Sequence, residues 1–381
     1  MVLSLINSPK FDIFHGCHIE IDGDRIPNLY ETVSEITVDA SRKIAAVATL
    51  KFEDVSEADG SWAAKDSPFL KIGKKIKIIV NFGSYDETLF VGFIASTSSD
   101  YPEESGNGTY TLQCQDESVA LNQVHHRLNR SDGNPVSDFA VLGDITKDHK
   151  LKLDSQSAKG LVSSNLMQAG SDIEFLRDRA KANGYDLMVF DGVLYFGPQR
   201  FTNHVQHVIT LNAGKKTCCQ NFSVSVDVNR ADVIYFDIAE EKGAGLKRHQ
   251  FEPNLPLLGE RPAKEPNAKI GKSEWSLCQT GTPDIDEAEA YAQGLINEES
   301  LRVSATGTLD ANLFGHVLVP MTVIAVDGAS RDDSGYYYVD SVTHSLSHNV
   351  YTQKFKLVRN GIGDDRSGRS SNAVSVVAGL F

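Results

Sequence analysis

Histidine pairs are the residues of this sequence whose type and spacing could do chemistry. His204 and His207 are three residues apart, and His344 and His348 are four apart, which are spacings that some zinc sites use. Neither pair lies beside a third His, Cys or carboxylate in a recognised arrangement. Residues three apart in a strand face opposite sides of the sheet, so His204 and His207 should diverge. We therefore expect no metal role for either pair.

The cysteines are the other reactive side chains. Their number is odd and their spacing is irregular, which differs from a secreted disulfide framework, so we expect reduced, buried thiols. Cys218 and Cys219 are adjacent, and neighbouring strand residues point to opposite faces, so this pair does not make a zinc motif. The five are Cys17, Cys114, Cys218, Cys219 and Cys278.

The sequence contains no motif that marks a catalytic centre. A Cys-His hydrolase needs a thiolate beside an imidazole. Neither Cys114 nor Cys278 has a histidine at a spacing that indicates such a catalytic pair. A glycosidase needs two carboxylates across a cleft, and 51 acidic residues leave such a pair open without marking one. G-x-S-x-G, H-E-x-x-H and a phosphate-binding glycine loop are missing from the sequence. We expect no catalytic, cofactor-binding or metal-binding residue, and we expect His125-His126 at the surface or an interface.

Length and charge limit the possible classes of protein. The 381 residues are enough for two or three domains, and no apolar run approaches the ~20 residues of a membrane helix. The N-terminal stretch MVLSLINSPKFDIF has no basic segment before a long apolar one, so we expect no secretory signal and synthesis in the cytoplasm. A net charge of −14 argues against a protein that binds the phosphate backbone of nucleic acid. An acidic wall would let DNA pass without binding, and simple solubility is the alternative explanation of the charge.

The first third of the chain predicts β structure. Short alternating segments with frequent turns occupy residues 17–52 and 72–116, and the segment from Ile76 to Val80 alternates Lys with Ile before turning apolar. The pattern is typical of a small antiparallel barrel or sandwich, assigned to residues 1–125.

The middle of the chain, residues 126–200, predicts a small α/β module. Ser171 is a good N-cap with Glu174 three residues later, which is a capping box, and Asn183-Gly184 is a good helix stop. The helix should span about 171–183, and Asp191-Gly192 should turn a hairpin behind it. Shorter helices are expected over residues 118–128 and 137–143.

A second β domain is expected over residues 201–360, interrupted by a loop-and-helix insertion at 241–299. Residues 241–275 hold four of the twelve prolines and a small excess of basic side chains, which predicts a long loop, and Asp284 to Ser300 predicts a helix. A strand is expected over residues 317–326. Residues 361–381 have a linker composition followed by an apolar end, which predicts a flexible docking tail. The fold class expected from all this is mainly β (α+β).

Four segments together resemble the late control D family of contractile-tail hubs, which is related to the N-terminal part of VgrG proteins. Each is a packing signature, and Leu346 stands where the family commonly has Phe. The segments are Ile72 to Ile94, Asp172 to Tyr185 with the following hairpin, Ser300 to Gly315, and Tyr338 to Ser347.

The resemblance implies two barrels similar to tail-tube subunits, with the α/β module between them. It implies a homotrimer whose six barrels form a pseudo-sixfold ring that adapts the tail tube to a threefold spike, as part of the central channel. The expected partners are the tube protein, a separate spike protein, other baseplate proteins and the tape measure, with DNA only as passing cargo and no stable membrane association. The expected location is the tail baseplate of a virion, with no cofactor and no enzymatic activity.

Two other hypotheses about the function stay open. One is a tail-associated peptidoglycan hydrolase. The other is the hub of a contractile injection system that is not a phage.

Overall fold

The computed structural model describes residues 14–103, 107–202, 205, 207–239, 246–265, 268–278, 285–347 and 350–364. It confirms the mainly β fold class, because large antiparallel sheets dominate and helices are few. None of the helices in this described part has the length and hydropathy that a membrane span requires. The docking tail predicted over 361–381 falls almost wholly outside the described residues.

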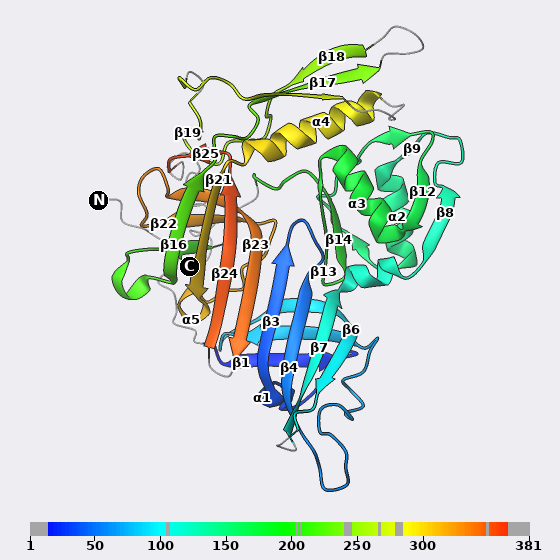
Figure 1. The fold of residues 1–381 in the computed structure, drawn as a ribbon, viewed down its shortest axis with the longest axis vertical. Helices are drawn as coiled ribbons and strands as arrows, with labels where there is room; N and C mark the ends of the chain where they lie inside the picture. The colour runs from blue at the N-terminus through cyan, green and yellow to red at the C-terminus, as the bar shows by residue number, and fades with distance from the viewer. Residues whose placement is uncertain are drawn as a thin grey trace.

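A curved sheet formed by the N-terminal part of the chain makes up the first β region (Figure 1). Burial alternates along its strands, as in β4, because every second side chain points into the core. The core contains Ile36, Leu50, Phe52 and Ile78 among others. Its elements are β1 (Gly16–Ile21), β2 (Asp24–Arg25), α1 (Leu29–Thr32), β3 (Val33–Ser41), β4 (Val47–Val55), β5 (Lys75–Asn81), β6 (Asp86–Asp100) and β7 (Asn107–Asp116).

A similar sheet formed by the C-terminal part makes up the second β region. Apolar clusters cover both of its faces, one around Tyr337 and Leu357 and one around Tyr338 and Phe201. Its elements are β15 (Val208–Thr210), the 3-10 helix η2 (Gly214–Lys216), β16 (Cys219–Val226), β21 (Val303–Asp310), α5 (Ala311–Phe314), β22 (Val323–Asp327), β23 (Gly335–Ser347) and β24 (Val350–Arg359).

The two β regions repeat one strand order. Across the sheet, the first reads β3-β4-β7-β6-β5-β1 and the second reads β16-β21-β24-β23-β22-β15, so each position matches in space and in chain order. The first four pairings are antiparallel in both regions. Only the last pairing differs, because β1 is antiparallel to β5 whereas β15 is parallel to β22. Each chain therefore carries two copies of one β unit.

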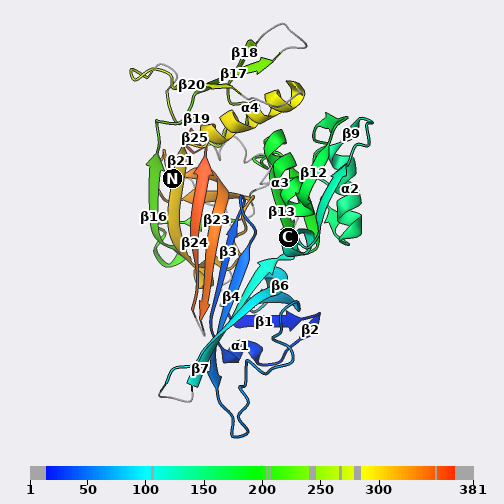
Figure 2. The ribbon, with the colours of Figure 1, turned by 45° about the vertical axis from the view of Figure 1, so that its right-hand side comes forward.

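The two units join edge to edge in one 13-stranded sheet. Strand β23 of the second unit pairs antiparallel with β3 of the first, from Ser341 opposite Ser41 to Leu346 opposite Ile36. Figures 1 and 2 show the resulting continuous run of strands from β16 through β3 to β7.

A compact α/β module lies beside this sheet, to the right in Figure 1. The predicted capping box is present, because the Ser171 hydroxyl accepts from the Glu174 N–H and the Glu174 carboxylate accepts from the Ser171 N–H. The helix ends at Gly184 and the predicted hairpin follows. The elements are β8 (His125–Asn129), β9 (Val136–Ser137), α2 (Asp138–Asp148), β10 (Lys152–Leu153), β11 (Val162–Ser163), β12 (Met167–Ser171), α3 (Asp172–Asn183), β13 (Asp186–Phe190) and β14 (Val193–Gly197).

The insertion between β16 and β21 is more ordered than the sequence predicts. Residues 241–275 were expected to be a loop, but β18 (Leu246–Phe251) and the start of β20 (Glu274–Cys278) flank β17 (Val233–Ala239) in a three-stranded sheet. The predicted helix is α4 (Ile285–Ser300), whose Ala288, Ala292 and Ile296 pack against that sheet. A short pair, β19 (Arg261–Pro262) with β25 (Gly361–Ile362), ties the insertion to the end of the described chain.

Two further predictions are wrong in part. The helix expected over 118–128 is a 3-10 turn, η1 (Glu117–Asn122), followed by β8, because β8 finds a partner in β12. The strand expected over 317–326 begins only at Val323, because Pro320 lacks an N–H for the ladder and Met321 takes a positive φ of 62°.

Candidate functional site

The junction between the two β units is the candidate functional site, because both units, the α/β module and the insertion helix meet there. At the β3–β23 joint the Thr343 hydroxyl donates to Asp39 Oδ1 over 2.6 Å. Leu346 and Tyr351 of the second unit lie in the core of the first. The two units therefore share backbone pairing, a side-chain hydrogen bond and apolar packing.

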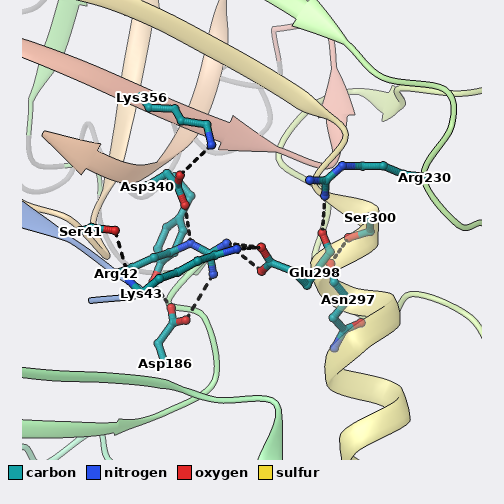
Figure 3. Close-up of polar contacts among 11 residues, drawn as sticks. Ser41, Arg42, Lys43, Asp186, Arg230, Asn297, Glu298, Ser300, Asp340 and Lys356 are labelled. Carbon is teal, nitrogen blue, oxygen red and sulfur yellow. Dashed lines mark hydrogen bonds and ion pairs between the residues drawn. The ribbon is translucent and has the colours of Figure 1, made fainter. Parts of the chain in front are cut away.

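Arg42 lies at the centre of this junction, directly after β3 (Figure 3). Its Nε donates to Asp340 Oδ1 of β23 over 2.7 Å, and its Nη2 donates to Glu298 Oε1 of α4 over 2.6 Å. Its Nη1 reaches Asp186 Oδ1 of β13 at 3.3 Å. One guanidinium therefore links the first β unit, the module, the insertion helix and the second β unit. We call Arg42, Asp186, Glu298 and Asp340 the Arg42 cluster.

Further groups complete the hydrogen bonding of the three carboxylates. Lys43 Nζ lies 2.7 Å from Glu298 Oε1, and Lys356 Nζ lies 3.1 Å from Asp340 Oδ2. The Tyr338 hydroxyl donates to Asp186 Oδ2 over 3.0 Å. Lys43 and Lys356 together with Arg42 set three cations against the three carboxylates, so the formal charges of this larger group balance. Removing one partner from such a buried network would leave a charge uncompensated, which is strongly destabilising.

The cluster shifts the pKa values of its members in different directions. Burial would raise the pKa of Glu298 and of Asp340, but Arg42 and the neighbouring lysines outweigh burial and hold both values below the usual range. Asp186 is the most deeply buried of the three, and there burial outweighs Arg42 and raises the pKa. The three carboxylates keep Arg42 protonated, since they raise its pKa although burial lowers it.

A cavity of about 520 Å³ lies beside the cluster. All parts of the chain contribute to its wall, with Ile44 from the first β unit, Leu187 from the module, Leu295 from α4 and Val319 from the second unit. Side chains therefore leave part of the junction unfilled, and Arg42, Asp186 and Glu298 line this space.

Each predicted histidine pair has one member within the described residues. His204 and His348 lie outside them. His207 stacks on His316 with ring centroids 3.6 Å apart, and burial together with His316 lowers the pKa of His207 to about 4. His344 is buried against the Tyr351 hydroxyl at 2.9 Å, where burial lowers its pKa to about 3.

His316 marks a second contact between the β units. Its Nδ1 lies 2.7 Å from Glu87 Oε1 of β6, and the other oxygen of Glu87 accepts from the Val317 N–H. The rings of Tyr85 and His316 also stack. His125 and His126, expected at the surface, lie on β8, where His126 Nε2 is 3.8 Å from Asp172.

Four of the five cysteines are buried and Cys278 is exposed. Burial raises the pKa of Cys114 to about 12 and of Cys219 to about 11, and it also raises the pKa of Cys17 and Cys218. A thiol with a raised pKa is a poor nucleophile at neutral pH. Within the described ranges, no three His, Cys, Asp or Glu side chains are grouped as a metal site.

Sequence reasoning did not find the Arg42 cluster. Its members are spread over about 300 residues of sequence, and no two of them are close together in the chain. The cluster could be predicted only if the long-range pairing of β3 with β23 were already known.

Solved structures with this fold include phage tail proteins. The 43 kDa tail protein of prophage MuSo2 from Shewanella oneidensis aligns with a TM-score of 0.67 at 12% identity, covering 91% of this chain and 98% of that one. A tail protein of Neisseria meningitidis MC58 gives 0.66 at 11% identity, over 91% and 97%. The Escherichia coli c3393 protein, a component of the type VI secretion system, gives 0.54 at 11% identity, over 90% and 76%. At these identities the likeness establishes the fold.

No curated protein matches the sequence. The family model described as the Alg8 N-terminal domain matches residues 13–348, which is most of the chain. By this match the chain belongs to the Alg8 N-terminal domain family.

Proposed function

We propose that this protein is a structural hub of a contractile phage tail or tail-like particle, of the late control D and VgrG-like type. In this role three copies form a ring that adapts a sixfold tube to a threefold spike and encloses part of the central channel. The observation that carries the proposal is the repeated strand order, since a chain with two equivalent β units presents six units in a trimer. Closed rings of this kind are a common solution for homo-oligomers.

The junction supports a role in which geometry is the function. The backbone joint, the Arg42 cluster and the Glu87–His316 contact hold the two β units in one relative position and orientation. A subunit that must present two units at equal spacing around a ring needs such a fixed relation. The phage tail proteins with this fold add support to a structural role in a tail.

The proposed partners are the tube protein on one face, a separate spike protein on the other, and further baseplate proteins. DNA or another cargo would pass through the channel. The net charge of −14 suits an acidic channel wall that does not hold phosphate.

The mass and symmetry of the purified full-length protein test the proposal. We expect a particle of three chains, and averaged electron micrographs should show a threefold ring with six similar lobes. A protein that remains a single chain at all concentrations, and also in the presence of its tube protein, would count against the hub.

A tail-associated peptidoglycan hydrolase is the alternative from another class. Incubating the protein with purified peptidoglycan separates the two, since release of soluble fragments would favour the hydrolase. The neighbouring genes separate a phage from another injection system, because a phage locus also encodes a capsid.

A further inference from the structure

Two strand edges are left open in the described part of the structure. Strand β16, at one end of the large sheet, pairs there only with β21, and its other edge is open. Strand β6 pairs with β5 only through Asp86–Phe93, so Ala95–Asp100 pairs on one side with β7 and is open on the other among the described residues. Figures 1 and 2 place β16 and β6 on opposite flanks of the molecule.

These two open edges correspond to the two strands that form the internal joint. In the repeat, β16 matches β3 and β6 matches β23, and β3 pairs with β23 inside the chain. β6 and β23 are also built alike. β6 pairs with β5, and β23 pairs with β22, in each case only through the first part of the longer strand. Beyond its pairing with β22, the same edge of β23 pairs with β3, whereas the corresponding edge of β6 pairs with no described strand.

The irregularities of the ladders fix the correspondence residue by residue. The register shifts after Val33 in β3 and after Cys219 in β16, so Asp39 matches Ser225. It shifts after Val339 in β23 and after Ile94 in β6, so Thr343 matches Ser98. Because Thr343 lies opposite Asp39 at the internal joint, the repeat puts Ser98 of one copy opposite Ser225 of the next.

We propose that β16 of one copy pairs antiparallel with residues 96–100 of β6 in a second copy, and so repeats the internal joint between chains. This inference rests on the ring of the proposed function and specifies how its subunits join. The pairing is head to tail, because the two edges differ, and head-to-tail pairing gives a ring when the rotation between copies closes. The occupant of each edge is therefore another copy of this chain.

The side chains on the two edges suit such a joint. β16 has the sequence CQNFSVSV and carries no charged residue, although exposed edges are usually protected by charges or proline. In the matched register Phe222 lies opposite Tyr101, which is 51% exposed in the single chain. The equivalent pair at the internal joint, Ile36 with Leu346, is buried. Joining two copies would bury the matching pair in the same way.

Disulfide trapping in the full chain tests the register. Cys278→Ser removes the one exposed thiol, and Ser98→Cys with Ser225→Cys places a thiol on each open edge. Directly opposed strand residues lie ~4.5–5.5 Å apart at Cα, within reach of a disulfide. The matched control is Ser98→Cys with Ser223→Cys, which keeps the same face but slips the register by two residues, a separation of ~7–8 Å. The two single variants serve as further controls.

We expect oxidation of the Ser98→Cys/Ser225→Cys chain to give a ladder that ends at three linked chains, while the control pair and the single variants stay unlinked. A three-chain particle in which this pair links no faster than the control pair would overturn the joint and leave the hub proposal standing. A dimer linked through Ser225→Cys alone would show that β16 pairs with itself and would also overturn the joint. A ladder that runs beyond three chains would support the joint and contradict the threefold ring.

Introducing charges at the same two positions gives a second readout that does not depend on disulfide chemistry. Like charges directly opposite one another destabilise strand pairing. Ser98→Lys with Ser225→Lys should therefore shift the particle toward single chains, whereas Ser98→Lys with Ser225→Glu should restore assembly. Equal assembly of the two double variants would argue against the register.

Discussion

Gly184 and Gly294 meet backbone against backbone where the module touches the insertion helix. A Cβ placed on Gly294 would lie 2.3 Å from the Gly184 Cα, which is closer than real side chains allow. Gly184 ends α3 with a positive φ of 66°, a conformation that suits glycine, whereas Gly294 has ordinary helical geometry within α4. The absence of a side chain at residue 294 therefore serves the close approach of two helices.

Gly294→Ala should lower the stability of the protein, although alanine favours helices. The added methyl group has no space, and overpacking costs ~1–3 kcal/mol. Gly143→Ala in α2 is the matched control, because nothing lies within 4 Å of its added Cβ and alanine should stabilise that helix by ~0.5–1 kcal/mol. Urea unfolding of both variants checks the prediction, and a gain of stability in both would contradict the close contact.

Arg42→Met should destabilise the junction strongly. Methionine retains much of the side-chain volume but leaves Asp186, Glu298 and Asp340 without their shared cation, and breaking a buried pair costs ~3–5 kcal/mol. Urea unfolding measures the loss. Solution scattering of the folded variant should also show a less fixed arrangement of the β units.

Arg248→Met is the control for the loss of an arginine as such. Arg248 pairs with Asp237 on an exposed strand, where solvent screens the interaction, so little change in unfolding is expected. Equal unfolding curves for the Arg42 and Arg248 variants would mean that the Arg42 cluster does not hold the junction.

Local patterns predicted much of the fold, and long-range pairing accounts for what they missed. Ser171 with Glu174, and Asp191 with Gly192, encode a helix start and a hairpin within a few residues, and both are present. β18 was missed because its ladder depends on β17, and no property of Leu246–Phe251 alone marks a strand. Arg42 looks like any turn residue until β23 pairs with β3, so the junction could not be predicted from sequence spacing.

His344 should make stability depend on pH. Burial lowers its pKa from 6.5 to about 3, so below pH 6.5 the unfolded chain binds a proton that the folded chain refuses. The stabilisation is therefore complete above pH 6.5 and is lost as the pH falls toward 3, by ~1.4 kcal/mol per pH unit. His344→Gln removes this group. The free energy of unfolding of the variant should fall less steeply between pH 6.5 and 5 than that of the unchanged protein, and equal slopes would contradict a neutral buried His344.

Thiol labelling should distinguish Cys278 from the other four cysteines. Maleimide and disulfide reagents react with the thiolate, and burial both blocks access to Cys17, Cys114, Cys218 and Cys219 and raises their pKa values. One thiol per chain should therefore react quickly in the folded protein at neutral pH, and five should react in denaturant. Cys278→Ser should abolish the fast reaction and leave the denatured count at four. Fast labelling that persists in Cys278→Ser would mean that one of the cores opens readily, and the Cys218-Cys219 pair beside the open edge of β16 would be the first place to look.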